Sequence, residues 1–103
     1  MWHVIQEESG YPTNIEEYTS VTRKVRRVGR FDFALAKRAV QINRPTRIAV
    51  MGIDYVSYED YGKEEMQLSK QSWSFLAKLS SLGPIKYIGT GPNLNHIIDL
   101  CKN

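Results

Sequence analysis

The segment from residue 32 to residue 88 constrains the fold of this 103-residue chain most strongly. It begins with apolar residues at spacings of three and four, which predict a helix over about 32–43 with one broad apolar face. Asp32 precedes that helix and can cap its free N–H groups. Pro45 then ends the helix, and the apolar run 47–53 predicts a strand buried on both faces.

A second helix and a second strand complete this pattern. Ser69 is placed to cap a helix running to residue 82, and Gly83 is a typical stop. The run 85–88 follows as a strand. A strand, helix, strand order favours parallel pairing through a right-handed crossover. The sequence therefore predicts one α/β domain over residues 1–103, with a small, mostly parallel sheet flanked by helices.

The two ends of the chain carry weaker patterns. Residues 2–6 are rich in residues that favour strands, and 15–18 could form one helical turn. A final helix is expected from Asn93 or Asn95 through Cys101.

Composition excludes several classes of protein. With 42% hydrophobic and 24% charged residues the chain is expected to be globular and not disordered. No apolar run approaches the roughly 18 residues of a membrane span, and the N-terminus lacks a signal-peptide pattern, so we expect a cytoplasmic protein with no membrane partner. Cys101 has no partner cysteine, and neither His3 nor His96 has a second ligand at metal spacing, so no metal site is expected.

Positive charge is concentrated between residues 21 and 47. Nine Lys and Arg side chains lie there with a single acid, Asp32, a net charge of +8, whereas the first 20 residues carry four Glu. The cationic run breaks at Gly29 and leads into the first predicted helix. This arrangement is suited to holding an anion. A solvated surface run and a nucleic-acid contact are the alternatives, although aromatic residues are not interleaved with the cations as base stacking would require.

Asp54 arrives at the carboxyl end of the first predicted strand, and the turn 89–92 follows the second. Ligands of open α/β sheets bind at that end, so the carboxylate and the turn could form a slot for a purine. A helix cap or turn acid is the alternative for Asp54. Three tyrosines, which recur every three residues, could line a helix face or cover the sheet edge: Tyr55, Tyr58 and Tyr61.

Five short motifs occur in the order found in a known family. They are Ser-Gly-Tyr-Pro-Thr at 9–13, Val-Thr-Arg-Lys-Val-Arg-Arg at 21–27, Gly-Arg-Phe-Asp at 29–32, Gly-Ile-Asp at 52–54 and Gly-Thr-Gly-Pro at 89–92. In this respect the chain resembles the C-terminal region of adenylosuccinate synthetase, with spacing most similar to the short archaeal form. That enzyme is a ligase of purine biosynthesis, which joins aspartate to inosine monophosphate with GTP and magnesium.

The resemblance implies two part-sites. The basic loop would contact the aspartate substrate and the nucleotide ribose through Thr22, Lys24 and Arg26. The guanine base would be bound by a second set of residues, which are Asp54, Gly89, Gly91 and Pro92. GTP is therefore the nucleotide that the resemblance implies, and no other cofactor is expected.

The chain also departs from the family pattern. Arg23 stands where the family has a glycine, Lys24 replaces an arginine, and Gly52 replaces a lysine that packs on the guanine. The sequence contains no glycine-rich phosphate loop, and no catalytic aspartate or histidine is recognised in it. We therefore predict no catalytic residues and no activity of the chain alone, and at most weak binding of a purine nucleotide or other small anion.

Two further functions stay open at this point. The chain could be an interaction subunit that completes a separate N-terminal half or pairs with itself as a homodimer. It could also be a small nucleic-acid-binding protein that uses the basic 23–47 surface, in which case its affinity would fall steeply with salt.

Overall fold

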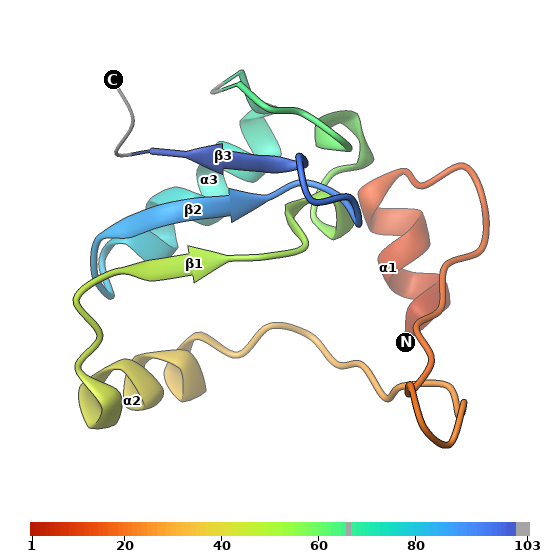
Figure 1. Cartoon of the computed structure of the whole chain (residues 1–103), viewed down its shortest axis with the longest axis horizontal. Helices are drawn as coiled ribbons and strands as arrows, with labels where there is room; N and C mark the ends of the chain where they lie inside the picture. Colours follow the sequence, from red (N-terminus) through yellow and green to blue (C-terminus); the bar gives the residue numbers. More distant parts are fainter. Residues whose placement is uncertain (66, 101–103) are drawn as a thin grey trace.

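The computed structural model describes residues 1–65 and 67–100 (Figure 1). In chain order the elements are helix α1 Trp2–Ser9, helix α2 Phe33–Asn43, strand β1 Ile48–Val50, the 3-10 turns η1 Ile53–Tyr55 and η2 Tyr58–Asp60, helix α3 Lys70–Ser80, strand β2 Ile85–Gly89 and strand β3 Ile97–Asp99.

The sheet has the order β1-β2-β3. β1 and β2 pair in parallel, with α3 as the crossover, which confirms the predicted strand, helix, strand unit. β3 pairs antiparallel with β2, so the sheet is mixed. Figure 1 shows α3 behind the sheet and α1 beyond the carboxyl ends of β1 and β2. The small α/β architecture expected from the sequence is therefore present.

Both predicted helix caps are formed. The Asp32 carboxylate accepts a hydrogen bond from the Leu35 N–H at 3.1 Å, and the Ser69 hydroxyl accepts one from the Ser72 N–H at 3.3 Å. Such caps satisfy N–H groups that the first helical turn leaves free. The predicted stop at Gly83 is wrong, because α3 already ends at Ser80 with Ser81 as its cap.

The N-terminal predictions are wrong. Residues 2–6 form helix α1 and not a strand, and the helix ends at Gly10, whose φ of 83° is in the left-handed region. Tertiary contacts override strand propensity here, since the Trp2 ring packs edge-on against Tyr55 at a centroid distance of 5.8 Å. The predicted helical turn at 15–18 is absent, because Tyr18 pairs with Val25 in an isolated antiparallel bridge.

The C-terminal prediction is also wrong within the described residues. A helix was expected from Asn93 or Asn95, but residues 97–99 form β3, and Cys101 lies outside the described residues. The edge of β2 offers backbone hydrogen-bonding groups, and pairing with it buries Ile98 to 1% exposure.

The predicted strand 47–53 is shorter than expected and is not buried on both faces. β1 ends at Val50, and its central residue, Ala49, is exposed. Gly52 then adopts a φ of 81°, which turns the chain into η1. This conformation is one that glycine adopts at little cost.

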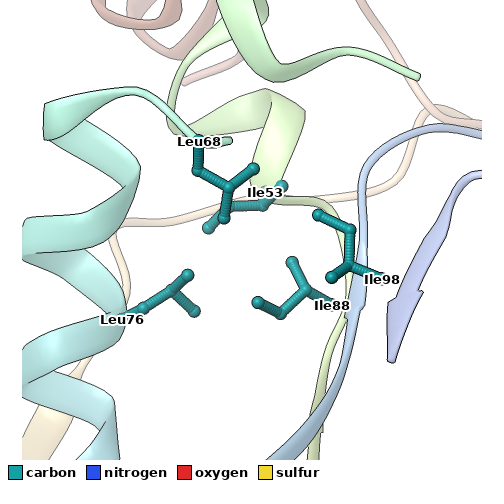
Figure 2. Close-up of a cluster of buried hydrophobic side chains, with 5 residues drawn as sticks. All are labelled: Ile53, Leu68, Leu76, Ile88 and Ile98. Atoms are coloured by element: carbon teal, nitrogen blue, oxygen red, sulfur yellow. The ribbon is translucent and has the colours of Figure 1, made fainter. Parts of the chain in front are cut away.

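The core is small and lies between α3 and the sheet. Ile53, Leu68 and Leu76 face Ile88 and Ile98 from the strands (Figure 2). All five side chains are at most 9% exposed. None of residues 10–52 is buried, and on α2 the side chains of Leu35 and Ile42 are 66% and 69% exposed.

Candidate functional site

A cleft of about 530 Å³ lies at the carboxyl end of β1, beside the turn that follows β2. Asp54, Gly91 and Pro92 line it, so the fold brings together three of the four residues predicted to bind guanine. Tyr11, Tyr55 and Tyr61 also line the cleft and give it an aromatic wall. The volume is within the range of small-molecule sites.

Asp54 is the central polar group of the cleft. It follows Gly52 in η1 and is 4% exposed, and one of its carboxylate oxygens, Oδ2, accepts a hydrogen bond from the Tyr11 hydroxyl. Burial raises the pKa of the Asp54 carboxyl, and the nearby Glu17 adds to the rise, while the Tyr11 hydrogen bond opposes it. A buried carboxylate of this kind favours any ligand that donates hydrogen bonds to its charged form.

Tyr11 is a functional candidate that residue-by-residue prediction missed, although it lies inside the motif 9–13. Its ring packs against Tyr58 with centroids 4.4 Å apart and against Tyr55 at 5.7 Å. Burial, followed by its hydrogen bond to Asp54, raises the pKa of the Tyr11 hydroxyl. The Tyr11 hydroxyl therefore stays protonated at neutral pH and donates its hydrogen bond to Asp54.

Glu17 connects the cleft to the basic loop. Its carboxylate, which lines the cleft, accepts a hydrogen bond from the Tyr55 hydroxyl at 2.9 Å. Its backbone carbonyl accepts the Arg26 N–H at 2.6 Å. The same residue therefore lines the cleft and, through its backbone, bonds to Arg26 of the cationic run.

The basic loop is a hairpin held by local bonds. The Thr19 N–H donates to the Lys24 carbonyl at 2.8 Å, and the Lys24 N–H donates to the Thr19 hydroxyl at 3.0 Å. Trp2 of α1 donates its indole N–H to the Arg26 carbonyl at 2.9 Å. Arg23 lies at the tip of the hairpin with a φ of 52°. Glycine adopts a positive φ at less cost than arginine, so a glycine would suit this position.

Thr22, Lys24 and Arg26, the three residues predicted to bind the anion, are exposed on this hairpin. None of them is among the described residues that line the cleft. The structure therefore places the residues predicted for the anion outside the cleft, and Glu17, which lines the cleft, bonds to the hairpin that carries them.

The glycines of the turn are covered by side chains that sequence reasoning missed. A Cβ atom at Gly89 would lie 2.6 Å from the Met51 Cε atom, and one at Gly91 would collide with the His96 ring. Gly89 is not among the residues lining the cleft, whereas Met51 is.

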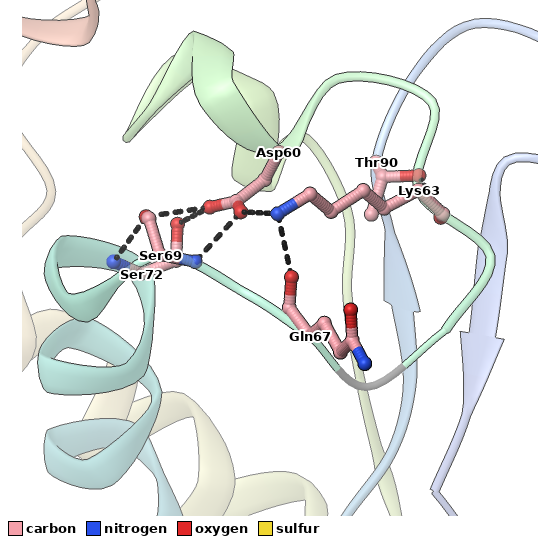
Figure 3. A network of polar contacts seen from close by, with 6 residues as sticks. All are labelled: Asp60, Lys63, Gln67, Ser69, Ser72 and Thr90. Carbon is pink, nitrogen blue, oxygen red and sulfur yellow. Dashed lines mark hydrogen bonds and ion pairs between the residues drawn. The ribbon is translucent and has the colours of Figure 1, made fainter.

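A buried polar network positions the turn that carries Gly91 and Pro92 (Figure 3). Thr90 donates its hydroxyl to the Lys63 carbonyl at 2.6 Å and accepts the Gly62 N–H at its own carbonyl at 2.9 Å. Asp60 links Lys63 to α3. The Lys63 ammonium group forms an ion pair with one carboxylate oxygen of Asp60 at 3.2 Å.

Asp60 is fully buried, and its carboxylate is the acceptor of every hydrogen bond described here. It accepts the Ser69 N–H and the Ser69 hydroxyl, each at 2.7 Å, and also the Ser72 hydroxyl. Burial alone would raise the pKa of Asp60, but the hydrogen bonds from Ser72 and Ser69 outweigh it, so the pKa is lowered. The network stabilises an ionised carboxylate and, through Lys63, the wall of the cleft.

Neither a metal cluster nor a membrane-spanning helix is found among the described residues. Across residues 1–65 and 67–100, no group of three or more His, Cys, Asp or Glu side chains is placed to hold a metal ion. No helix in the described ranges is long and apolar enough to cross a membrane.

Comparison with known proteins identifies relatives of part of a larger enzyme. No protein-family model matches the chain. The chain is 40% identical over 96 residues to the adenylosuccinate synthetase of Methanocaldococcus jannaschii. The aligned region covers 90% of this chain and 28% of that protein. The enzymes of Thermococcus sibiricus and Archaeoglobus fulgidus are 37% and 33% identical, over 96% and 93% of this chain. The chain spans less than a third of the length of these relatives.

Proposed function

Because the chain is homologous to part of the archaeal adenylosuccinate synthetases, we propose that it binds a purine nucleotide without turning it over. The base would lie in the cleft at Asp54, and the anionic end would reach the basic loop. The observation that carries this proposal is the convergence of Asp54, Gly91 and Pro92 on one cleft of ligand size.

The charges of the cleft favour a base with hydrogen-bond donors. Glu17 and Asp54 both line the cleft, so its lining repels phosphate. Guanine offers an exocyclic amine and a ring N–H on one edge, which a carboxylate accepts, whereas adenine presents a ring acceptor there. Guanine nucleotides are therefore expected to bind more tightly than adenine nucleotides.

The loop complements the cleft with the opposite charge. The Arg26 N–H donates to the Glu17 carbonyl, and its guanidinium Nε donates to the Tyr18 carbonyl at 3.4 Å, so the side chain lies on the hairpin near the cleft residue Glu17. Arginine binds carboxylate or phosphate with two parallel hydrogen bonds, and Lys24 adds a point charge.

Calorimetric titration with GMP, AMP and a short oligonucleotide tests the proposal. We expect GMP to bind, AMP to bind at least tenfold more weakly, and Asp54→Asn to remove the preference. Affinity for the oligonucleotide that exceeds that for GMP and falls steeply with salt would instead identify the nucleic-acid alternative.

The anion part-site is tested by two substitutions that remove the same charge. Arg26→Ala removes a charge-assisted hydrogen bond of about 1.5–3 kcal/mol. Lys37→Ala removes an exposed charge worth roughly 0.2–1 kcal/mol. The loss of GMP affinity should therefore be about tenfold larger for Arg26→Ala. Equal small losses would show diffuse attraction in place of a site.

Activity assays test the proposal that the chain binds the nucleotide without turning it over. The purified chain should form no adenylosuccinate and hydrolyse no GTP above a buffer blank. Activity that survives repurification would contradict it.

A second candidate function is that of an interaction subunit, and the surface of α2 favours it. Leu35 and Ile42 are exposed on this helix, and an apolar cavity of about 480 Å³ opens beside α1, lined in part by Phe31, Phe33 and Phe75. Apolar surface of this kind is usually covered by a partner.

Light scattering over a wide concentration range tests this candidate through self-association. A homodimer that Leu35→Asp converts to a monomer would support it. A monomer at all concentrations would leave a separate N-terminal half as the partner to test, by mixing the chain with the complementary region of an archaeal relative.

A further inference from the structure

Met51 has an unusual position for an apolar side chain next to the core. It follows β1 directly and is 63% exposed. It lines both the cleft at Asp54 and the neighbouring apolar cavity, which also share Gly52 and Tyr55. Its side chain therefore borders both cavities and has open space beside it.

The thioether of Met51 nevertheless packs closely over the backbone of Gly89. Its Cε and Sδ atoms would lie 2.6 and 2.9 Å from a Cβ atom at Gly89, so the side chain occupies the space that the absent Cβ leaves. Gly89 is buried at the end of β2 and does not line the cleft itself. The glycine thus provides a seat for Met51.

A bound base would lack an apolar contact on the side of the cleft at Gly52. In the proposed function Asp54 meets the edge of the base, and Gly52, which also lines the cleft, has no side chain to offer to the face of the ring. A flat ring that is bonded at its edge and bare on one face gains little from burial. Met51, one residue before Gly52, has the flexible and polarisable side chain that contacts aromatic rings favourably.

We propose that Met51 is the residue that covers one face of the bound base, with Gly89 as its seat. This inference rests on the proposed function, since it concerns the same cleft. The Met51 contact adds affinity in proportion to ring area and so favours purines over smaller rings. In this arrangement Gly89 acts on the ligand through Met51 and does not contact it.

Methyl NMR on the full chain tests this contact directly. The protein contains three methionines, Met1, Met51 and Met66, so labelling with methyl-¹³C methionine gives a simple spectrum. Loss of one signal in Met51→Leu assigns it. GMP should shift the Met51 methyl signal upfield through the ring current of the base, and ribose 5-phosphate, which has no base, should not.

Two substitutions test the seat. Met51→Ala should weaken GMP binding roughly twofold to tenfold, the affinity equivalent of a sulfur–aromatic contact. Gly89→Ala displaces Met51 without adding a side chain to the cleft and should weaken binding by a similar factor. In the double variant the two losses should not add, because both act on one contact. Ile42→Ala, on the exposed part of α2, is the matched control and should leave affinity unchanged.

The outcomes separate this inference from the proposed function. GMP binding with an unmoved Met51 methyl signal, or additive losses in the double variant, would overturn the role of Met51 and leave the nucleotide site intact. A chain that binds no GMP overturns both. Thermal unfolding of each variant in the absence of ligand shows whether a lost affinity reflects lost folding.

Discussion

The two halves of the molecule are held together in different ways. Residues 53–100 contain the apolar core and the buried Asp60 network, whereas none of residues 10–52 is buried. Apart from β1, which pairs with β2, the second group is held by individual contacts, such as the Trp2 bond to the Arg26 carbonyl and the exposed ion pair between Arg30 and Glu8 at 3.0 Å. An exposed pair of this kind contributes about 0–1 kcal/mol.

This difference separates the candidate site into a stable part and an adaptable part. Asp54 and the turn with Gly91 lie in the packed half, and the opposite side of the cleft, which includes Tyr11 and Glu17, comes from the exposed half. The cations of the basic loop lie in the exposed half, where changes of conformation cost little because few contacts are lost. Under the proposed function, the group that meets the edge of the base would be fixed by packing, whereas the cations that meet its anionic end would adjust to the ligand.

The largest expected effect compares one apolar truncation in each half. Ile88→Ala, in the core, should lower the free energy of unfolding by roughly 2–5 kcal/mol, because it leaves a cavity at a side chain that is 0% exposed. Leu35→Ala, on α2, should change it by less than about 0.5 kcal/mol. Urea unfolding measures both, and similar losses would show that α2 is packed in solution.

The next effect concerns the buried carboxylate of the packed half. Asp60→Asn should destabilise the fold by roughly 1–3 kcal/mol at pH 7, since it removes hydrogen bonds to a charged group. The pKa of Asp60 is lowered on folding, so its stabilising contribution is present above the unfolded pKa of about 3.9 and is lost as pH falls through the folded value. Unfolding at pH 7 and pH 3 should show the difference between the two proteins shrinking in acid.

Asp54 is expected to behave in the opposite way. Its pKa is raised on folding, so its contribution to stability is present below the unfolded pKa and is lost as pH rises through the folded value. Asp54→Asn should therefore be more stable than the wild type at pH 7, by roughly 0.5–1 kcal/mol, as is common where function costs stability. The gain should disappear in acid. A loss of stability at pH 7 would show that Asp54 is a structural residue.

The smallest effect lies in the exposed half. Arg23 has a positive φ and Lys24 does not, so Arg23→Gly relieves backbone strain while Lys24→Gly only adds freedom to the unfolded chain. Lys24→Gly should be less stable than Arg23→Gly by about 1 kcal/mol at most, seen as faster amide exchange in the hairpin. The reverse order would mean that the loop has another conformation in solution.

The helix N-caps and the features that follow from the order of elements were predicted correctly from the sequence. Asp32 and Ser69 cap their helices as expected, since a cap depends on groups within one helical turn. The parallel pairing of β1 and β2 follows from the order of elements and the handedness of crossovers. The grouping of Asp54 with Gly91 and Pro92 follows in turn, because the carboxyl ends of parallel strands meet at one edge of a sheet.

The remaining features depend on contacts between distant residues, and only the tertiary structure decided them. Residues 2–6 form a helix that packs on the rest of the fold through Trp2 and Tyr55, and residues 97–99 form a strand by pairing with the edge of β2. Likewise, the bond from Tyr11 to Asp54 joins residues 43 positions apart. Propensity is a weak local preference, and burial and pairing with distant partners outweigh it.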